Sequence, residues 1–139
     1  MNLPTDLTTG EIYHIYSKSI HGYKIFNRPE DYKRMLALVQ YYQWKKLPLP
    51  FSHFLESFPT QKLGFKASLI KISDGSQKIV QLIAYCLMET HIHFILKQLA
   101  DSGISQFISR TFDGYSKYFN LLHNRRGPLW ESRFGRRPI

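Results

Sequence analysis

At 139 residues the chain has the length of one ordinary domain, and its 43% apolar content is enough to build a packed core, which excludes intrinsic disorder. No run of eighteen uncharged apolar residues occurs, so the sequence predicts no membrane partner. Residues 1–10 lack the pattern of a signal peptide, and the single cysteine, Cys86, lies in an apolar run, so we expect a cytoplasmic protein.

The charge is strongly basic. Nineteen Lys and Arg residues against ten Asp and Glu residues give a net charge of +9, which favours a polyanionic partner such as nucleic acid. The alternative is a basic surface that serves only solubility. Residues 103–139 concentrate the excess, and aromatic residues are interspersed there, a combination typical of proteins that bind unpaired nucleic acid.

The first half of the chain predicts a strand, a helix and an insertion. Residues 11–18 alternate and are rich in β-formers, which predicts a strand. Asn27 is the expected cap of a helix that has Pro29 in its first turn and ends near Trp44. Residues 47–77 contain several prolines and glycines, and we interpret them as an insertion packed by its own aromatic residues, with a short helix at 51–58 and a strand at 67–72.

The second half predicts a hairpin, a long helix and a last strand. Residues 79–88 are almost continuously apolar, which favours a strand covered on both faces, and residues 91–99 alternate as its hairpin partner. Residues 104–122 have helical spacing over five turns, and 129–134 is the expected last strand. The order β-α-(insertion)-β-β-α-β predicts an α+β fold, a ferredoxin-like antiparallel sheet with a central His-x-His hairpin strand and packed helices.

His91 and His93 are the predicted metal ligands. Residues two apart in a strand share a face, so the two imidazoles can hold one cation together with a third ligand, for which His14 is a candidate. Two surface histidines with ordinary hydrogen bonds are the alternative for the pair. Because the only cysteine is not at ligand spacing, Mg²⁺ or Mn²⁺ is favoured over zinc.

Three stretches together resemble one known family. Residues 83–96, which contain His91-Ile92-His93, are similar to the His-hydrophobic-His strand of the single-tyrosine HUH transposases, and more narrowly of the REP-associated branch of the insertion-sequence-200-like group. Residues 13–18 resemble the first strand of that family. Residues 104–134, with Tyr118-Phe119-Asn120, resemble its helix and following strand. The resemblance covers most of the chain outside residues 47–77.

The resemblance implies a function. Members of the family bind single-stranded or hairpin DNA, hold a divalent cation on the two histidines, and cleave and rejoin DNA through a 5′-phosphotyrosine without ATP or another nucleotide cofactor. It also implies a homodimer and a location at the nucleoid of a bacterial or archaeal cytoplasm. The basic residues and one aromatic residue expected to contact DNA are Lys18, Arg125, Arg126, Trp130, Arg133, Arg136 and Arg137. For each arginine, a solvated surface role is the alternative.

The sequence departs from the family in two places. Glu89-Thr90 stands where the family has Pro-Asn before the first histidine. The family has its nucleophilic tyrosine in a Tyr-Ile-x-x-Asn-Pro helix after the last strand, and this motif does not occur in the 139 residues. We therefore expect a single transposase-like domain, 1–139, without the catalytic-tyrosine helix. Tyr115 and Tyr118 are the substitute nucleophiles to consider, although their helical spacing favours a core role.

Two other functions compete with an active transposase. A non-catalytic DNA-binding remnant would keep the histidines and the basic surface without cleaving DNA. An RNA-binding module is disfavoured because neither hairpin strand carries the expected stacking motif.

Overall fold

The computed structural model describes residues 7–139, apart from the side chain of Phe58. The strands are β1 (Ile12–Lys18), β2 (Val80–Met88), β3 (His91–Gln98) and β4 (Gly135–Pro138). The helices are the short 3-10 turn η1 (Ile20–Gly22), α1 (Pro29–Tyr42), α2 (Phe51–Glu56), α3 (Phe58–Leu63), α4 (Phe65–Ser73) and α5 (Gly103–Leu122). Outside the insertion, the elements follow the predicted order β-α-β-β-α-β.

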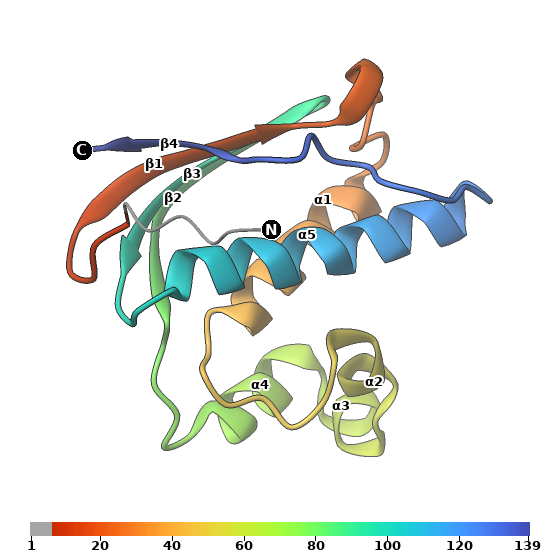
Figure 1. Ribbon diagram of the computed structural model, residues 1–139. Coiled ribbons are helices and arrows are strands. Elements are labelled where there is room, and N and C mark those ends of the chain that lie inside the picture. Colours follow the sequence, from red (N-terminus) through yellow and green to blue (C-terminus); the bar gives the residue numbers. More distant parts are fainter. Residues whose placement is uncertain (1–6) are drawn as a thin grey trace.

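The four strands form one antiparallel sheet in the order β2-β3-β1-β4. This is the strand order of a split β-α-β pair, so the predicted α+β fold with a His-x-His strand in the middle of the sheet is confirmed. Figure 1 shows α1 and α5 side by side beneath the sheet, with β4 and the C-terminus at its edge.

Among residues 7–139, helices cover only one face of the sheet. In β1 and β3, buried and partly exposed residues alternate strictly, which is the pattern of a strand with one face in the core. Tyr13 and Ile15 from β1 and Ile92, Phe94 and Leu96 from β3 point toward the helices. The side chains between them therefore point to the uncovered face.

Helix α5 supplies the other half of the core. Its fully buried stripe includes Ile104, Phe107 and Tyr115, at the spacing expected from the sequence. After the helix, residues 123–134 run back beside β1, and Trp130 stacks on Phe112 at a ring distance of 4.2 Å. This packing corrects the predicted last strand: Leu129 and Trp130 lie in the core, residues 131–133 are exposed, and the segment forms one isolated bridge, Ser19–Trp130. Strand β4 forms at 135–138 instead.

The start of α1 also differs from expectation. Arg28, and not Asn27, occupies the cap position. The carboxylate of Asp31 accepts hydrogen bonds from the backbone amides of Asn27 and Arg28 at 2.9 and 3.1 Å, and Tyr118 from α5 donates to the same carboxylate at 2.7 Å. One buried acid therefore satisfies the amides before the helix and joins α1 to α5.

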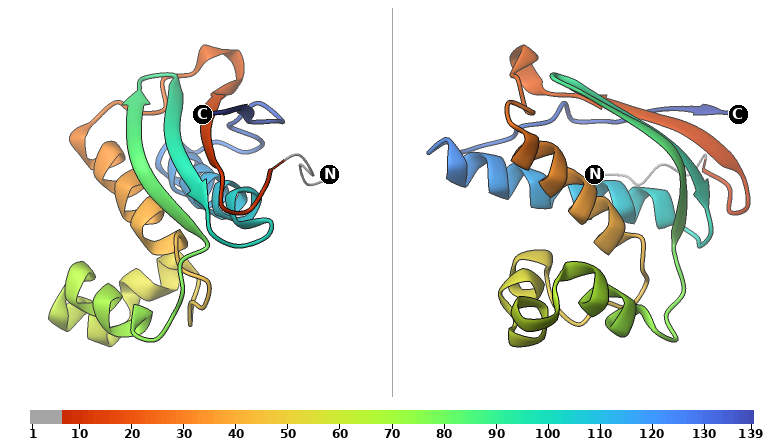
Figure 2. Two further views of the ribbon diagram at one scale, coloured as in Figure 1. Left: turned by 90° about the vertical axis from the view of Figure 1, so that its left-hand side faces the viewer. Right: turned by 180° about the vertical axis from the view of Figure 1, so that it is seen from behind.

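The regular secondary structure of the insertion, residues 47–77, consists of the helices α2, α3 and α4. A strand at 67–72 was the wrong prediction, because Phe65, Leu69 and Ile72 recur at helical spacing and pack on one side of α4. The helices α2–α4 lie on the far side of α1 and α5 from the sheet, as both views of Figure 2 show. Tyr41 of α1 donates a hydrogen bond to the Leu49 carbonyl and stacks near Phe54, which anchors the segment.

Strand β2 lies at the edge of the sheet, and most of its side chains are exposed, so the prediction that both its faces are covered was wrong. Ile83, Tyr85 and Met88 are 43–50% exposed, and a register shift between Leu82 and Ala84 interrupts the ladder. The continuous apolar run reflects an edge beside an uncovered face, not a central strand. Among residues 7–139, no helix is both long and apolar enough to cross a membrane.

Candidate nucleic-acid and metal site

The uncovered face of the sheet gathers histidines from two strands. Tyr16 lies opposite His93, and Lys18 lies opposite His91, in the β1–β3 ladder. Directly opposed residues share a face, and residues two apart on a strand do too, so His14 joins this group. We refer to His14, His91 and His93 as the histidine cluster.

Two members of the cluster touch. Nε2 of His14 lies 2.9 Å from Nδ1 of His93, and the rings stack at 5.1 Å with planes 22° apart. His91 stands beside them, its ring centre 5.2 Å from that of His93 and nearly perpendicular to it. Its Nδ1 is 3.2 Å from the hydroxyl of Thr90. In their present rotamers the side chains of residues 7–139 form no group of three metal-ligating residues.

The electrostatic setting keeps His93 uncharged. Burial lowers the pKa of His93, and the neighbouring His14 and His91 lower it further because three imidazolium charges would repel one another. At neutral pH the ring therefore offers a lone pair, as a metal ligand or a hydrogen-bond acceptor requires.

The cluster is compatible with a divalent cation. An octahedral ion with bonds of about 2.1 Å holds neighbouring ligand atoms about 3 Å apart, close to the separation of the His14 and His93 nitrogens. The three side chains of the histidine cluster all donate through imidazole nitrogens. Cys86 lies opposite His93 in the β2–β3 ladder and is a neighbour of the cluster. Imidazole donors suit Mn²⁺ better than Mg²⁺, which prefers oxygen. His91 has to rotate to complete a three-ligand set.

Basic side chains border the cluster. Lys18 lies opposite His91, Arg137 of β4 lies opposite His14, and both are exposed. Lys97 follows His91, His93 and Ile95 in the alternation of β3 and shares their face. Among the described residues the histidines thus stand between cations on three strands, a setting that attracts phosphate.

The remaining predicted DNA contacts lie elsewhere. Arg136 points to the opposite side of β4 from Arg137, with its guanidinium 5.5 Å from the Phe134 ring. Arg125 donates to Asn120 and to the Pro128 carbonyl, both at 2.7 Å, so it braces the loop after α5. Arg126 and Arg133 are exposed on that loop.

Trp130 belongs to the core and not to an exposed stacking surface. It is only 9% exposed, its ring stacks on Phe112, and its indole N–H donates to the Phe112 carbonyl at 3.2 Å. Its place in the sequence beside several arginines suggested a base-stacking role, but the ring is turned inward.

The two substitute tyrosines lie on the helix side of the sheet. Tyr115 is completely buried and donates to the Ile25 carbonyl, and burial raises its pKa far above the ordinary value. Tyr118 is held by Asp31 and Arg28 at 2.7 and 3.1 Å. Burial raises the pKa of Tyr118, and its hydrogen bond to Asp31 raises it further. Neither hydroxyl shares the face of the histidine cluster.

Two residues of the uncovered face, Tyr16 and Lys97, are not among the site residues predicted from the sequence. Tyr16 has its ring 5.1 Å from that of His14 and 6.2 Å from that of His93. Lys97 lies four residues after His93 on β3 and therefore shares the face of His91 and His93. The period of two in β1 and β3 is the signal that identifies both.

Comparisons with known proteins support the fold. No protein-family model and no curated protein matches the sequence. Among solved structures, all of the chain aligns with 62% of a REP-associated tyrosine transposase bound to a REP hairpin, at a TM-score of 0.51 and 11% identity. All of the chain also aligns with 86% of a protein from Deinococcus radiodurans R1 that is provisionally named a transposase, at a TM-score of 0.50 and 12% identity. The chain thus spans less than two thirds of the first structure, and at these identities the likeness establishes a transposase-like fold.

Proposed function

We propose that this protein is a transposase-like DNA-binding protein that holds a phosphate of single-stranded or hairpin DNA, together with a divalent cation, on the uncovered face of its sheet. The observation that carries the proposal is the histidine cluster, which lies on the uncovered face of the sheet between basic residues, in a fold shared with transposases. One of those transposases is bound to a REP hairpin.

Each residue of this face has a distinct role in the proposal. His14, His91 and His93 are the ligands of the cation, Mg²⁺ or Mn²⁺, which when bound offsets negative charge on the phosphate. Lys18, Lys97 and Arg137 attract neighbouring phosphates through charge. The Tyr16 ring offers a face on which an unpaired base can stack.

Strand cleavage is the second candidate function, and it is favoured by the position of Tyr16. Among the strand tyrosines, Tyr13 and Tyr85 oppose residues of the buried face, whereas Tyr16 opposes His93. In such a reaction the tyrosine oxygen bonds to phosphorus, the bond from phosphorus to the 3′ oxygen breaks, and that oxygen takes up the proton given up by the tyrosine. The products are a 5′-phosphotyrosine and a free 3′-hydroxyl.

Fluorescence anisotropy with a hairpin-bearing single-stranded DNA in Mn²⁺ tests the binding proposal. We expect His91→Ala to weaken binding roughly tenfold or more, while His53→Ala, which removes an exposed histidine on α2, leaves the affinity unchanged. Equal affinities of His91→Ala and the native protein would refute the proposed site.

A denaturing gel tests cleavage separately. If Tyr16 is the nucleophile, a covalent protein–DNA band forms and disappears in Tyr16→Phe but persists in Tyr23→Phe, which alters an exposed tyrosine outside the sheet. DNA binding without any covalent band would leave a non-catalytic DNA-binding protein.

The exposed edge of the sheet supports a homodimer as part of the same proposal. Ile83, Tyr85 and Met88 of β2 are exposed hydrophobic residues, and the outer edge of the strand pairs with no other strand of residues 7–139. Pairing of two such edges would bury these side chains and join two sheets. We also propose that the protein belongs to the REP-associated HUH branch and acts at the nucleoid.

A further inference from the structure

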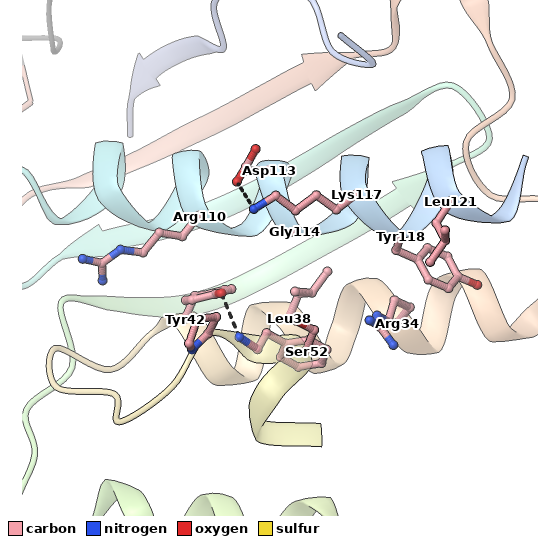
Figure 3. A pocket seen from close by; sticks show the side chains of 12 residues that line it. Arg34, Leu38, Tyr42, Ser52, Arg110, Asp113, Gly114, Lys117, Tyr118 and Leu121 are labelled. Carbon is pink, nitrogen blue, oxygen red and sulfur yellow. Dashed lines mark hydrogen bonds and ion pairs between the residues drawn. The ribbon is translucent and has the colours of Figure 1, made fainter. Parts of the chain in front are cut away.

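A second charged site lies on the helix side of the molecule, remote from the histidine cluster. A cavity of about 310 Å³ opens between α1, α5 and the first helix of the insertion, α2. Figure 3 shows Arg34 from α1, Arg110 and Lys117 from α5 and Ser52 from α2 around it. Its volume is at the lower end of the range for pockets that hold small molecules.

Arg34 is the central group of this cavity. Its guanidinium carbon lies 5.0 Å from the ring centres of both Phe51 and Tyr118, so the cation sits between two aromatic rings. Burial lowers the pKa of Arg34. Its buried Nε has no hydrogen-bond acceptor among residues 7–139, and no carboxylate of these residues forms an ion pair with it. A partly buried cation of this kind is stabilised when an anion binds beside it.

The rim adds further positive charge. Arg110 and Lys117 are exposed, and Asp113, 3.2 Å from Lys117, is the one acid among the described residues that line the cavity. Three cations thus face one carboxylate. Arg110 also borders an adjoining depression of about 330 Å³ that contains Lys45, so the basic surface continues along the start of the insertion.

Apart from Ser52, the rest of the lining is mainly apolar or aromatic. Leu38, Leu121 and the rings of Phe51 and Tyr118 form walls suited to a flat, weakly polar group. A ligand that combines a phosphate with a planar ring satisfies both parts of the cavity, whereas inorganic phosphate would leave the apolar walls exposed.

We infer that this cavity binds a nucleotide, with the phosphate at Arg34, Arg110 and Lys117 and the base against the apolar walls. The nucleotide comes either from free solution or from a strand of DNA that continues around the molecule. This gives the insertion a function, because Phe51 closes one side of the Arg34 sandwich. The inference does not depend on the histidine cluster.

Titrations with 5′-dAMP and with a short single-stranded DNA, both without divalent cation, test the inference. Arg34→Lys keeps the charge but loses the planar fork and the stacking, and we expect binding to weaken about tenfold. The double variant Arg110→Gln/Lys117→Gln alters only exposed side chains and should weaken binding by a similar factor. The double variant Lys66→Gln/Lys71→Gln, an equal change of charge at two exposed positions of α4, should bind as the native protein does.

The outcomes separate the two sources of the nucleotide. Weakened dAMP binding in the cavity variants indicates a free nucleotide, and a loss seen only with DNA indicates a strand. The inference would be overturned if the native protein bound neither probe, if Arg110→Gln/Lys117→Gln kept native affinity for both probes, or if Lys66→Gln/Lys71→Gln showed an equal loss. If dAMP binding sensitive to Arg34→Lys persists while DNA binding at the histidine cluster fails, only the proposed function is lost.

Discussion

The ring of Tyr16 on β1 occupies the space in which any residue larger than glycine at position 135 of β4 would place its Cβ. A Cβ built on Gly135 overlaps the ring carbons of Tyr16, its direct partner in the β1–β4 ladder. An aromatic side chain that covers a glycine across an edge pair holds the two strands in register. The same contact fixes the ring beside His14 and His93.

Gly135→Ala should therefore destabilise the protein by about 1–3 kcal/mol, because either the Tyr16 ring or strand β4 has to move. Urea unfolding of the native protein and the variant measures the change. In the double variant Gly135→Ala/Tyr16→Ala the overlap is gone, so the cost of the glycine change should largely disappear. A cost of the same size in both backgrounds would show that the ring is not the obstacle.

Asp31→Asn should cost about 2–3 kcal/mol, because it replaces a carboxylate that accepts several hydrogen bonds at the start of α1. Burial opposes ionisation of Asp31, but the hydrogen bonds from Tyr118, Asn27 and Arg28 outweigh it and lower its pKa. A lowered pKa gives stability that is present above pH 3.8 and is lost as the pH falls through the folded-state pKa. Unfolding measured from neutral to acidic pH should show this loss in the native protein and a smaller one in Asp31→Asn.

Tyr41→Phe tests the anchor of the insertion. Loss of the hydrogen bond to Leu49 should cost about 1 kcal/mol at neutral pH. Burial raises the pKa of Tyr41 to about 12, so the folded state favours the neutral phenol. The resulting stability is present below the unfolded pKa of 10.0 and is lost as the pH rises toward 12. Guanidinium unfolding between these pH values should therefore show that Tyr41→Phe loses less stability than the native protein as the pH rises. An equal loss of stability in both proteins would refute the proposed effect of Tyr41 ionisation.

The basic residues that border the histidine cluster should affect the salt dependence of DNA binding. Each phosphate contact removed lowers the slope of log affinity against log salt by about 1. Lys18→Gln and Arg137→Gln, which change the face of the histidine cluster, should each show this decrease. Lys71→Gln, an exposed position on α4, should leave the slope unchanged, and a decrease of equal size there would indicate a diffuse, nonspecific surface.

The sequence predicted those parts of the site that depend on alternation along one strand. Placement of His91 and His93 on one face follows from their spacing alone. The contact of His14 with His93 joins residues 79 positions apart, and it depends on the register of β1 on β3, which no local pattern specifies. The cavity at Arg34 requires three helices from two parts of the chain, so helical spacing gave no sign of it.

The errors in the predicted elements have a shared physical cause. A short apolar run does not distinguish a buried strand from an edge strand or a helix. Residues 67–72 therefore suggested a strand where α4 forms, and β2 suggested a covered strand where the sheet has an open edge. Trp130 suggested an exposed ring because its neighbours are charged, but the ring packs on Phe112.

The most direct test of the proposed function is a Mn²⁺ titration followed by electron paramagnetic resonance, with and without hairpin-bearing DNA. If the cluster holds the cation against a phosphate, DNA tightens Mn²⁺ binding and Mn²⁺ tightens DNA binding by the same factor. We predict that His93→Ala abolishes this coupling and that His53→Ala preserves it. Coupling of native size in His93→Ala, or no coupling in the native protein, would contradict the account.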